Sequence, residues 1–156
     1  MAMSFLNAAH LNSRHKKKFH GGRGQTGECY LTDHDGPLAG RRCLVLDDEF
    51  LIALDIQNIL ETAGAIVVCV AAADDALKLL GTDKRFDLAI IDVMLGDTAT
   101  SMPVTGRLAE LRIPFVFLTG MHSDEMHARH PDVPVVEKPY IADVLMKALH
   151  RVLAGK

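Results

Sequence analysis

Five short runs of apolar residues recur between residue 41 and the C-terminus, and they constrain the fold more than any other feature. The runs are rich in Val, Leu and Ile and lie at residues 43–46, 66–70, 88–91, 115–118 and 133–136. Because they lack a regular polar alternation, they indicate strands that are buried on both faces, as in a parallel sheet. We therefore expect an α/β domain with a five-stranded parallel sheet covered by helices on both faces.

Segments in which apolar residues follow helical spacing separate these runs. Helices are predicted at residues 50–63, 74–80, 104–111 and 141–153. Gly64 and Gly81 follow the first two helices as stop signals, and Asp74 is the expected N-cap of the second. Residues 121–132 are polar and are assigned to no element. The last helix has a wide apolar face, which we expect to serve a partner or a homodimer.

The first 40 residues differ in kind from the rest of the chain. They show neither helix nor strand periodicity and carry a net charge of +2, whereas residues 41–156 carry −5. We expect a mobile basic tail at residues 1–40 and one folded domain at residues 41–156. The basic run at residues 14–18 is interpreted as a solvated tail, because no aromatic or groove-reading element accompanies it.

Composition argues against several classes of protein. The net charge of −3 disfavours general binding to nucleic acid or membranes, and no apolar run approaches the roughly 20 residues that span a bilayer. The apolar N-terminal stretch precedes the basic run, which is the opposite order to a secretory signal. Cys29, Cys43 and Cys69 form no Cys-x-x-Cys pair and are interpreted as free thiols in a reducing compartment. We expect a cytoplasmic protein.

Polar residues of a useful kind follow four of the five predicted strands. They are the acids at positions 47–49, then Asp92, Thr119 and Lys138. In open parallel sheets the reactive crevice lies beyond the carboxyl ends of the strands, so these side chains should meet at one edge. Several carboxylates in one crevice repel one another unless a cation lies among them. Mg²⁺ suits such a site, because it accepts carboxylate, water and phosphate oxygens.

This pattern resembles the receiver domain of two-component response regulators. The resemblance covers residues 41–156 and rests on Leu44–Glu49, Leu88–Leu95, Thr119 and the Glu137-Lys138-Pro139 triplet. It implies a flavodoxin-like fold with strand order 2-1-3-4-5. It also makes Asp92 the phospho-acceptor, with Thr119 and Lys138 contacting the phosphoryl oxygens. The implied Mg²⁺ ligands are Asp48 and Asp92 directly, Asp47 through water, and the backbone carbonyl of Met94.

A narrower resemblance involves the segment Ile113–Met121. It is similar to the PFxFATGY motif of the "FAT GUY" receivers, single-domain alphaproteobacterial regulators that partner histidine kinases of the HWE or related type. Leu118 stands where that motif has Ala, and Met121 where it has Tyr. This resemblance implies a histidine kinase as phosphodonor and a downstream protein as target. Because 18 residues follow Lys138, we expect output through partner contact or as a phosphate sink.

Two further departures bear on how such a domain works. Val135 occupies the position, three residues before the lysine, where most receivers carry a switching Tyr or Phe. Thr119 remains as a residue that could order the segment 121–132. Met94 and Met121 lie two residues after Asp92 and Thr119. Apolar side chains there orient no attacking water, so we expect slow self-dephosphorylation.

Two other functions compete with this interpretation. A phosphatase with an aspartyl-phosphate intermediate usually has a second acid two residues after the nucleophile, where this chain has Met94. A pseudo-receiver, a binding module with the fold but no chemistry, remains an alternative because Val135 replaces the aromatic. Turnover of a separate substrate is not expected. His122, His127 and His130 lie near Asp124, but their spacing is typical of surface histidines rather than of a zinc site.

Overall fold

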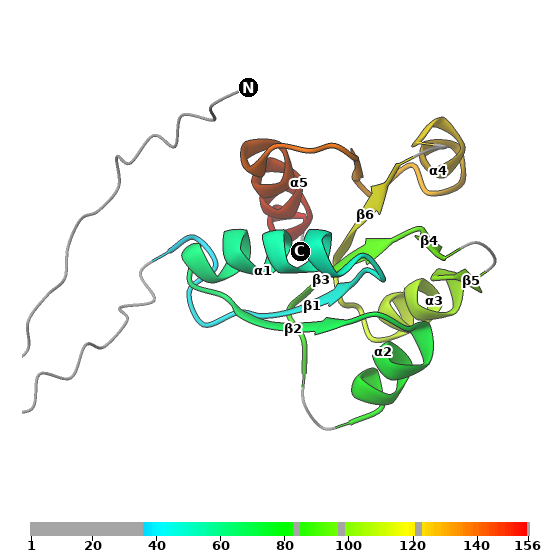
Figure 1. Ribbon diagram of the computed structural model, residues 1–156, viewed down its shortest axis with the longest axis horizontal. Helices are drawn as coiled ribbons and strands as arrows, with labels where there is room; N and C mark the ends of the chain where they lie inside the picture. The colour runs from blue at the N-terminus through cyan, green and yellow to red at the C-terminus, as the bar shows by residue number, and fades with distance from the viewer. Residues whose placement is uncertain (1–35, 83–84, 97–98, 121–122, 156) are drawn as a thin grey trace, which may run out of the picture. The chain divides into compact units, whose positions relative to one another are not determined.

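The computed structural model describes residues 36–82, 85–96, 99–120 and 123–155. Helices and strands alternate along these residues (Figure 1). The elements are β1 (Arg42–Leu46), α1 (Phe50–Thr62), β2 (Ile66–Val70), α2 (Ala73–Leu80), β3 (Leu88–Asp92), β4 (Met94–Leu95), β5 (Ala99–Thr100), α3 (Met102–Glu110), β6 (Phe115–Thr119), α4 (Ser123–Arg129), β7 (Val135–Glu137) and α5 (Ala142–Ala154).

The main sheet has five parallel strands in the order β2-β1-β3-β6-β7. This order confirms the flavodoxin-like fold, because these are the five predicted strands in the order 2-1-3-4-5. The strands β4 and β5 form a separate antiparallel hairpin after β3. The sequence did not predict that hairpin, since two-residue strands are too short to show a period.

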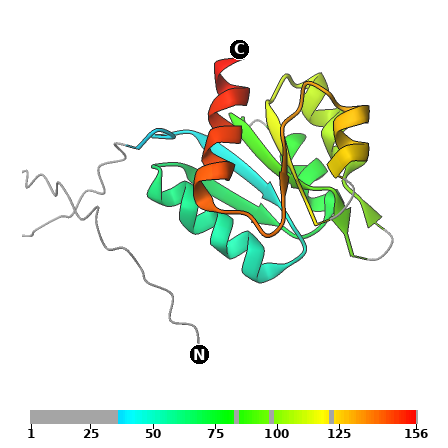
Figure 2. The ribbon, with the colours of Figure 1, turned by 90° about the horizontal axis from the view of Figure 1, so that it is seen from above.

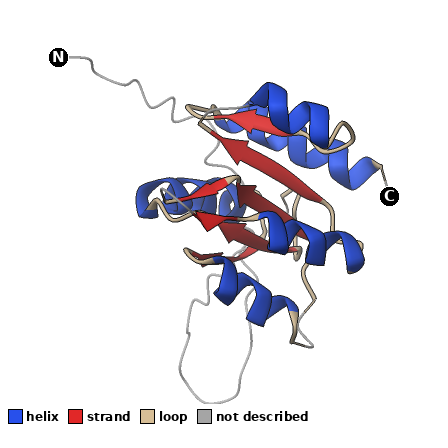
Figure 3. Ribbon diagram, turned by 90° about the vertical axis from the view of Figure 1, so that its right-hand side faces the viewer, coloured by secondary structure: helices blue, strands red, loops and turns tan. Residues whose placement is uncertain are grey.

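Successive residues of the central strands point to opposite faces and pack under different helices. On one face, Val45 and Ile90 pack with residues of α1 and α5. On the other face, Leu46 and Ile91 pack with residues of α2, α3 and α4. Figure 2 shows α1 and α5 together on one face, and Figure 3 shows the sheet between helices. Both faces are thus buried, which explains why the strands are apolar throughout.

Most predicted elements are correct to within two residues, but one local prediction was wrong. Asp74 is not the N-cap of α2, because the cap is Ala72 and Asp74 lies in the first turn. A negative charge there still interacts favourably with the helix dipole. Residues 121–132, assigned to no element, include the short helix α4. Within the described residues, no helix combines the length and apolar character that crossing a membrane requires.

The folded domain includes residues 36–40, which the sequence assigned to the tail. Leu38 is fully buried, and its backbone N–H donates to the carbonyl of Ala63 at the end of α1 (2.9 Å). Gly36 lies so close to Ala63 that a β-carbon would collide with the Ala63 carbonyl, so only glycine fits. The expected boundary at residues 40/41 is therefore too late. The rest of the expected mobile tail lies outside the described residues.

The apolar face of α5 is used mainly inside the domain. Leu145 and Leu149 are fully buried on the sheet, and Val152 packs against the same cluster. Ile141, just before the helix, and Val144 in its first turn remain exposed. The N-terminal half of α1 is also more exposed than its spacing predicted. These exposed positions lie at the end of the domain where the strands reach their carboxyl ends.

Candidate functional site

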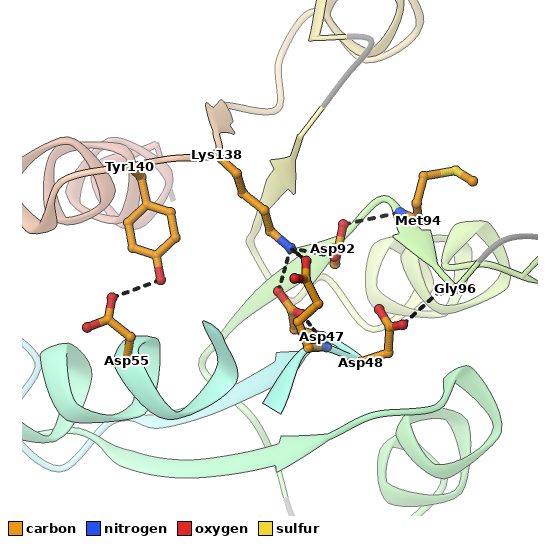
Figure 4. A network of polar contacts seen from close by, with 9 residues as sticks. Asp47, Asp48, Asp55, Asp92, Met94, Gly96, Lys138 and Tyr140 are labelled. Carbon is orange, nitrogen blue, oxygen red and sulfur yellow. Dashed lines mark hydrogen bonds and ion pairs between the residues drawn. The ribbon is translucent and has the colours of Figure 1, made fainter. Parts of the chain in front are cut away.

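Four charged side chains converge at the carboxyl ends of β1, β3 and β7. The ammonium nitrogen Nζ of Lys138 lies 2.7 Å from Oδ2 of Asp92, 2.9 Å from Oδ2 of Asp47 and 3.2 Å from Oε1 of Glu49. Figure 4 shows the lysine reaching down from its loop between the carboxylates of β1 and β3. We call these four residues the acidic crevice.

The sheet brings these residues together from distant parts of the sequence. Strands β1 and β3 are neighbours with Leu46 opposite Ile91, so Asp47 and Asp92 end up side by side. Lys138 follows β7 directly, and its backbone N–H donates to the carbonyl of Thr119 at the end of β6 (2.8 Å). That bond fixes where the lysine side chain starts. The expectation that strand ends meet at one edge is therefore correct for Asp47, Asp92 and Lys138.

Burial makes this crevice sensitive to charge. The side chain of Asp47 is 1% exposed and that of Asp92 is 6% exposed. Burial raises the pKa of Asp47, and the ion pair with Lys138 opposes that rise. Burial acts to lower the pKa of Lys138, but its bonds to Asp92 and Asp47 outweigh burial and raise it. The lysine therefore stays charged and partly neutralises the acids.

Asp92 is held by both of its carboxylate oxygens. Oδ2 accepts from Lys138, and Oδ1 accepts from the backbone N–H of Met94 (3.2 Å). These two contacts fix the orientation of the carboxylate, which a nucleophile needs. The Met94 side chain is 47% exposed and points away from the Asp92 carboxylate in Figure 4. Its apolar side chain offers no polar group to the crevice.

Asp48 has a different local role from Asp47. Its Oδ2 accepts from the backbone N–H of Gly96, 48 residues away (2.9 Å). Gly96 has a positive φ of 66°, a conformation that favours glycine. The Asp48 side chain thus connects the end of β1 to the loop after β4. It lies at the rim of the crevice and not against Lys138. It also lines a hollow of about 330 Å³ with Ala72 and Leu95.

The donor set of the crevice fits a hard divalent cation. Asp47, Glu49 and Asp92 each offer a carboxylate oxygen, and these oxygens lie within 4.8 Å of one another. Oδ2 of Asp47 is buried, and the charged group beside it is the Lys138 ammonium at 2.9 Å. Several carboxylate oxygens gathered in one place are suited to Mg²⁺. Glu49 was among the strand-end acids expected at this edge, but the sequence assigned it no role as a ligand.

The remaining predicted residues lie around this centre. Thr119 ends β6 and is buried, two strands from Asp47 in the sheet. His127 lies on α4, and His130 follows it with its ring 5.2 Å from the ring of Phe117. Among the described residues, neither histidine belongs to a cluster that could hold a metal. Met121 and His122 lie outside the described residues.

Comparison with known proteins gives a consistent assignment. No protein-family model matches the chain. The phyllosphere-induced regulator PhyR of Methylorubrum extorquens is 27% identical over 113 residues, which cover 68% of this chain and 42% of that protein. The chain thus spans less than half the length of this curated relative.

Two solved structures match over nearly their whole length. SdrG from Sphingomonas melonis Fr1 is 37% identical with a TM-score of 0.65, and the match covers 73% of this chain and 97% of SdrG. A response regulator receiver protein from Sinorhizobium medicae is 25% identical with a TM-score of 0.68, covering 75% and 97%. The strand order, the strand-end acids and these similarities agree. The chain therefore belongs to the response regulators, and its described residues form their receiver domain.

Proposed function

We propose that this receiver domain accepts a phosphoryl group onto Asp92 from a histidine kinase and, in that form, signals to a partner protein in the cytosol. The observation that carries the proposal is the contact of Lys138 Nζ with Asp92 (2.7 Å) and Asp47 (2.9 Å) at the edge of the sheet. A buried nucleophile beside a fixed cation is suited to attack on phosphorus.

The transfer itself needs little more than these groups. A carboxylate oxygen of Asp92 attacks the phosphorus, and the bond from phosphorus to the donor's imidazole nitrogen breaks. The nitrogen keeps the electron pair, and an acyl phosphate forms on Asp92. Lys138 then contacts a phosphoryl oxygen in place of the carboxylate, and the Thr119 hydroxyl is the proposed second contact. Positioning and charge neutralisation supply most of the acceleration.

Mg²⁺ is the cofactor that we propose, held by Asp47, Asp48, Asp92 and the backbone carbonyl of Met94. When bound, it neutralises the charge that develops on the phosphoryl oxygens. Glu49 extends this set, because its carboxylate already faces the crevice. The residues of the chain supply the rest: Lys138 counters the charge of two buried acids, and Met94 N–H orients the nucleophile.

Exposed apolar side chains around the crevice support docking of a protein phosphodonor. Receiver domains interact with histidine kinases. Here Phe50 and Leu51, which follow the crevice acids, are 74% and 77% exposed, and Ile141, three residues after Lys138, is 65% exposed. Apolar side chains so placed are typical of a protein-binding surface. The resemblance of Ile113–Met121 to the FAT GUY motif favours a single-domain regulator and a kinase of the HWE or related type.

Intact mass spectrometry tests the proposal directly. The protein is incubated with Mg²⁺ and acetyl phosphate beside the Asp92→Asn variant. An exposed acid on α2 gives the control, Asp75→Asn, which removes a carboxylate that pairs with Lys78 and is not one of the four crevice residues. We expect one added phosphoryl group in the wild type and in Asp75→Asn, and none in Asp92→Asn or without Mg²⁺.

The opposite result favours the pseudo-receiver alternative. The absence of an adduct, together with no Mg²⁺-dependent change in the NMR spectrum of the crevice residues, contradicts the proposal. The specific reason to keep this alternative is Val135, which stands where most receivers carry the Tyr or Phe whose movement signals phosphorylation. A pseudo-receiver keeps the fold and the docking surface but has no acceptor chemistry.

A further inference from the structure

The loop that carries Lys138 is tied to helix α1 by a hydrogen bond outside the acidic crevice. The Tyr140 hydroxyl donates to Oδ2 of Asp55, in the middle of α1, over 3.1 Å. The two residues are 85 positions apart in sequence. Figure 4 shows the tyrosine pointing from the loop onto α1, beside the lysine that points into the crevice.

This bond completes the anchoring of a short loop. On the near side, the backbone N–H of Lys138 donates to the Thr119 carbonyl. On the far side, Tyr140 holds the chain to α1 before α5 begins. Lysine has a flexible four-carbon stem, so the position of its ammonium group depends on how firmly its backbone is held. Without this bond, the far side of the loop is held only by the packing of the Tyr140 ring and of α5, which leaves the backbone next to Lys138 less firmly fixed.

The tyrosine is suited to a lasting donor role. Its ring packs against the core cluster beneath α1 and α5. Burial, followed by the hydrogen bond to Asp55 and the charge of that carboxylate, raises the pKa of Tyr140. The hydroxyl therefore keeps its proton across the physiological range, and the bond to α1 persists.

We infer that Tyr140 is a positioning residue for phosphoryl acceptance, which through its bond to Asp55 sets where Lys138 places its ammonium group. The inference rests on the proposed function. It also links the crevice to α1, the helix whose exposed apolar residues are proposed to dock the donor. Movement of α1 on docking is then passed to Lys138 through one hydrogen bond.

Three variants isolate the hydroxyl from the packing of the ring. Tyr140→Phe keeps the ring and removes the bond, and Asp55→Asn changes the acceptor. The matched control is Glu61→Gln on the same helix, an acid whose side chain accepts from the amide of Gln57 one turn away (2.8 Å). The rate of phosphorylation by acetyl phosphate is measured at saturating Mg²⁺. We expect Tyr140→Phe and Asp55→Asn to be about two- to tenfold slower, and Glu61→Gln to be unchanged.

The double variant tests whether the two residues act together. If they do, Tyr140→Phe with Asp55→Asn is no slower than either single variant. Rates that multiply, or single variants as fast as the wild type, overturn the inference while the wild-type adduct still supports the proposed function. An unphosphorylated wild type contradicts the proposed function instead, and the inference then depends on the second readout.

The second readout observes the lysine itself and needs no phosphorylation. In ¹⁵N-lysine-labelled protein, the Lys138 ammonium signal is identified by its absence in Lys138→Met. We expect this signal to shift or broaden in Tyr140→Phe and Asp55→Asn and to stay unchanged in Glu61→Gln. A merely structural role for Tyr140 lowers the melting temperature without moving the signal, and that result overturns the inference.

Discussion

The acidic crevice and the α4 side of the domain both adjoin the strand β7 but are held together by different forces. In the crevice, Lys138 bridges Asp47 and Asp92 at 2.7–2.9 Å. On the α4 side, Phe117 of β6 lies beside Val135 of the neighbouring strand β7. The centre of the His130 ring lies 5.2 Å from that of the Phe117 ring, and the two ring planes are tilted by 50°. One region depends on charge at fixed positions, and the other on the packing of rings and methyl groups.

The difference explains which parts of the family pattern this chain keeps. A phosphoryl acceptor needs a carboxylate and a cation in one geometry, so few residue types serve. A contact between α4 and the sheet needs only apolar volume, which several residues can supply. His130 and Phe117 provide an aromatic pair beside Val135, where most receivers place an aromatic residue on the strand. We expect this pair to connect α4 to the strand that carries Thr119.

The largest effect that distinguishes the two regions is expected at Lys138. Lys138→Met keeps an unbranched side chain of nearly the same length but leaves Asp47 and Asp92 buried without their cation. We expect the free energy of unfolding without Mg²⁺ to fall by about 3 kcal/mol, the cost of breaking a buried ion pair. Mg²⁺ should recover more stability in this variant than in the wild type, because it supplies the missing charge. Urea unfolding with and without saturating Mg²⁺ measures both.

The control is Lys78→Met on α2, where the ion pair with Asp75 is exposed to solvent. Exposed pairs contribute little, so its stability should match that of the wild type. If Lys138→Met is as stable as Lys78→Met, the crevice is not held by charge and the contrast with the α4 side fails.

The crevice was largely predictable because its residues follow strands. Asp92 comes directly after an apolar run and Lys138 directly after the strand β7, and the carboxyl ends of parallel strands share an edge. The bond of Asp48 to Gly96 was not predictable, since it depends on a backbone turn with positive φ. The place of Glu49 at this edge was predictable from the same strand end, but the direction of its side chain was not, because local geometry at the start of a helix sets that direction.

Elements without a clear period were the ones missed. The hairpin β4–β5 has two residues per strand, and α4 spans seven residues from Ser123 to Arg129. Short polar segments contain too few apolar residues to define a face, so their structure depends on tertiary packing. Met126 of α4 is buried and packs in the core cluster on the sheet. A single methionine in a polar stretch predicts nothing by itself.

A smaller effect is expected on the α4 side. His130→Ala removes the ring that packs on Phe117, and we expect a loss of about 1 kcal/mol in stability. Amide exchange in α4 should become faster, because the helix then has fewer buried contacts. Phosphorylation of Asp92 should be unchanged, since His130 is outside the acidic crevice. Hydrogen exchange with and without beryllofluoride, a phosphoryl mimic, measures whether α4 still responds.

Two variants control this experiment. His130→Phe keeps an aromatic ring and should retain the wild-type exchange, while His150→Ala removes an exposed histidine of α5. Should α4 respond to beryllofluoride equally in His130→Ala and in the wild type, the ring pair has no part in the response. The packing of His130 on Phe117 would then stabilise α4 without passing the phosphorylation signal to it.

The smallest effect is expected at Met94, which combines a polar backbone contact in the crevice with an apolar side chain. Its backbone holds Asp92, but its exposed side chain brings no polar group to the site. Met94→Asn introduces an amide that can orient an attacking water, so the acyl phosphate should hydrolyse about threefold faster or more, a change of roughly 0.7 kcal/mol in the barrier. Loss of the phosphoryl group is followed by intact mass after removal of the donor.

The control is Met94→Leu, which is equally apolar and should keep the wild-type half-life. Since Met94 is exposed, neither variant should change stability. An equal half-life in all three proteins would mean that water is excluded by other groups and that this position does not set the lifetime.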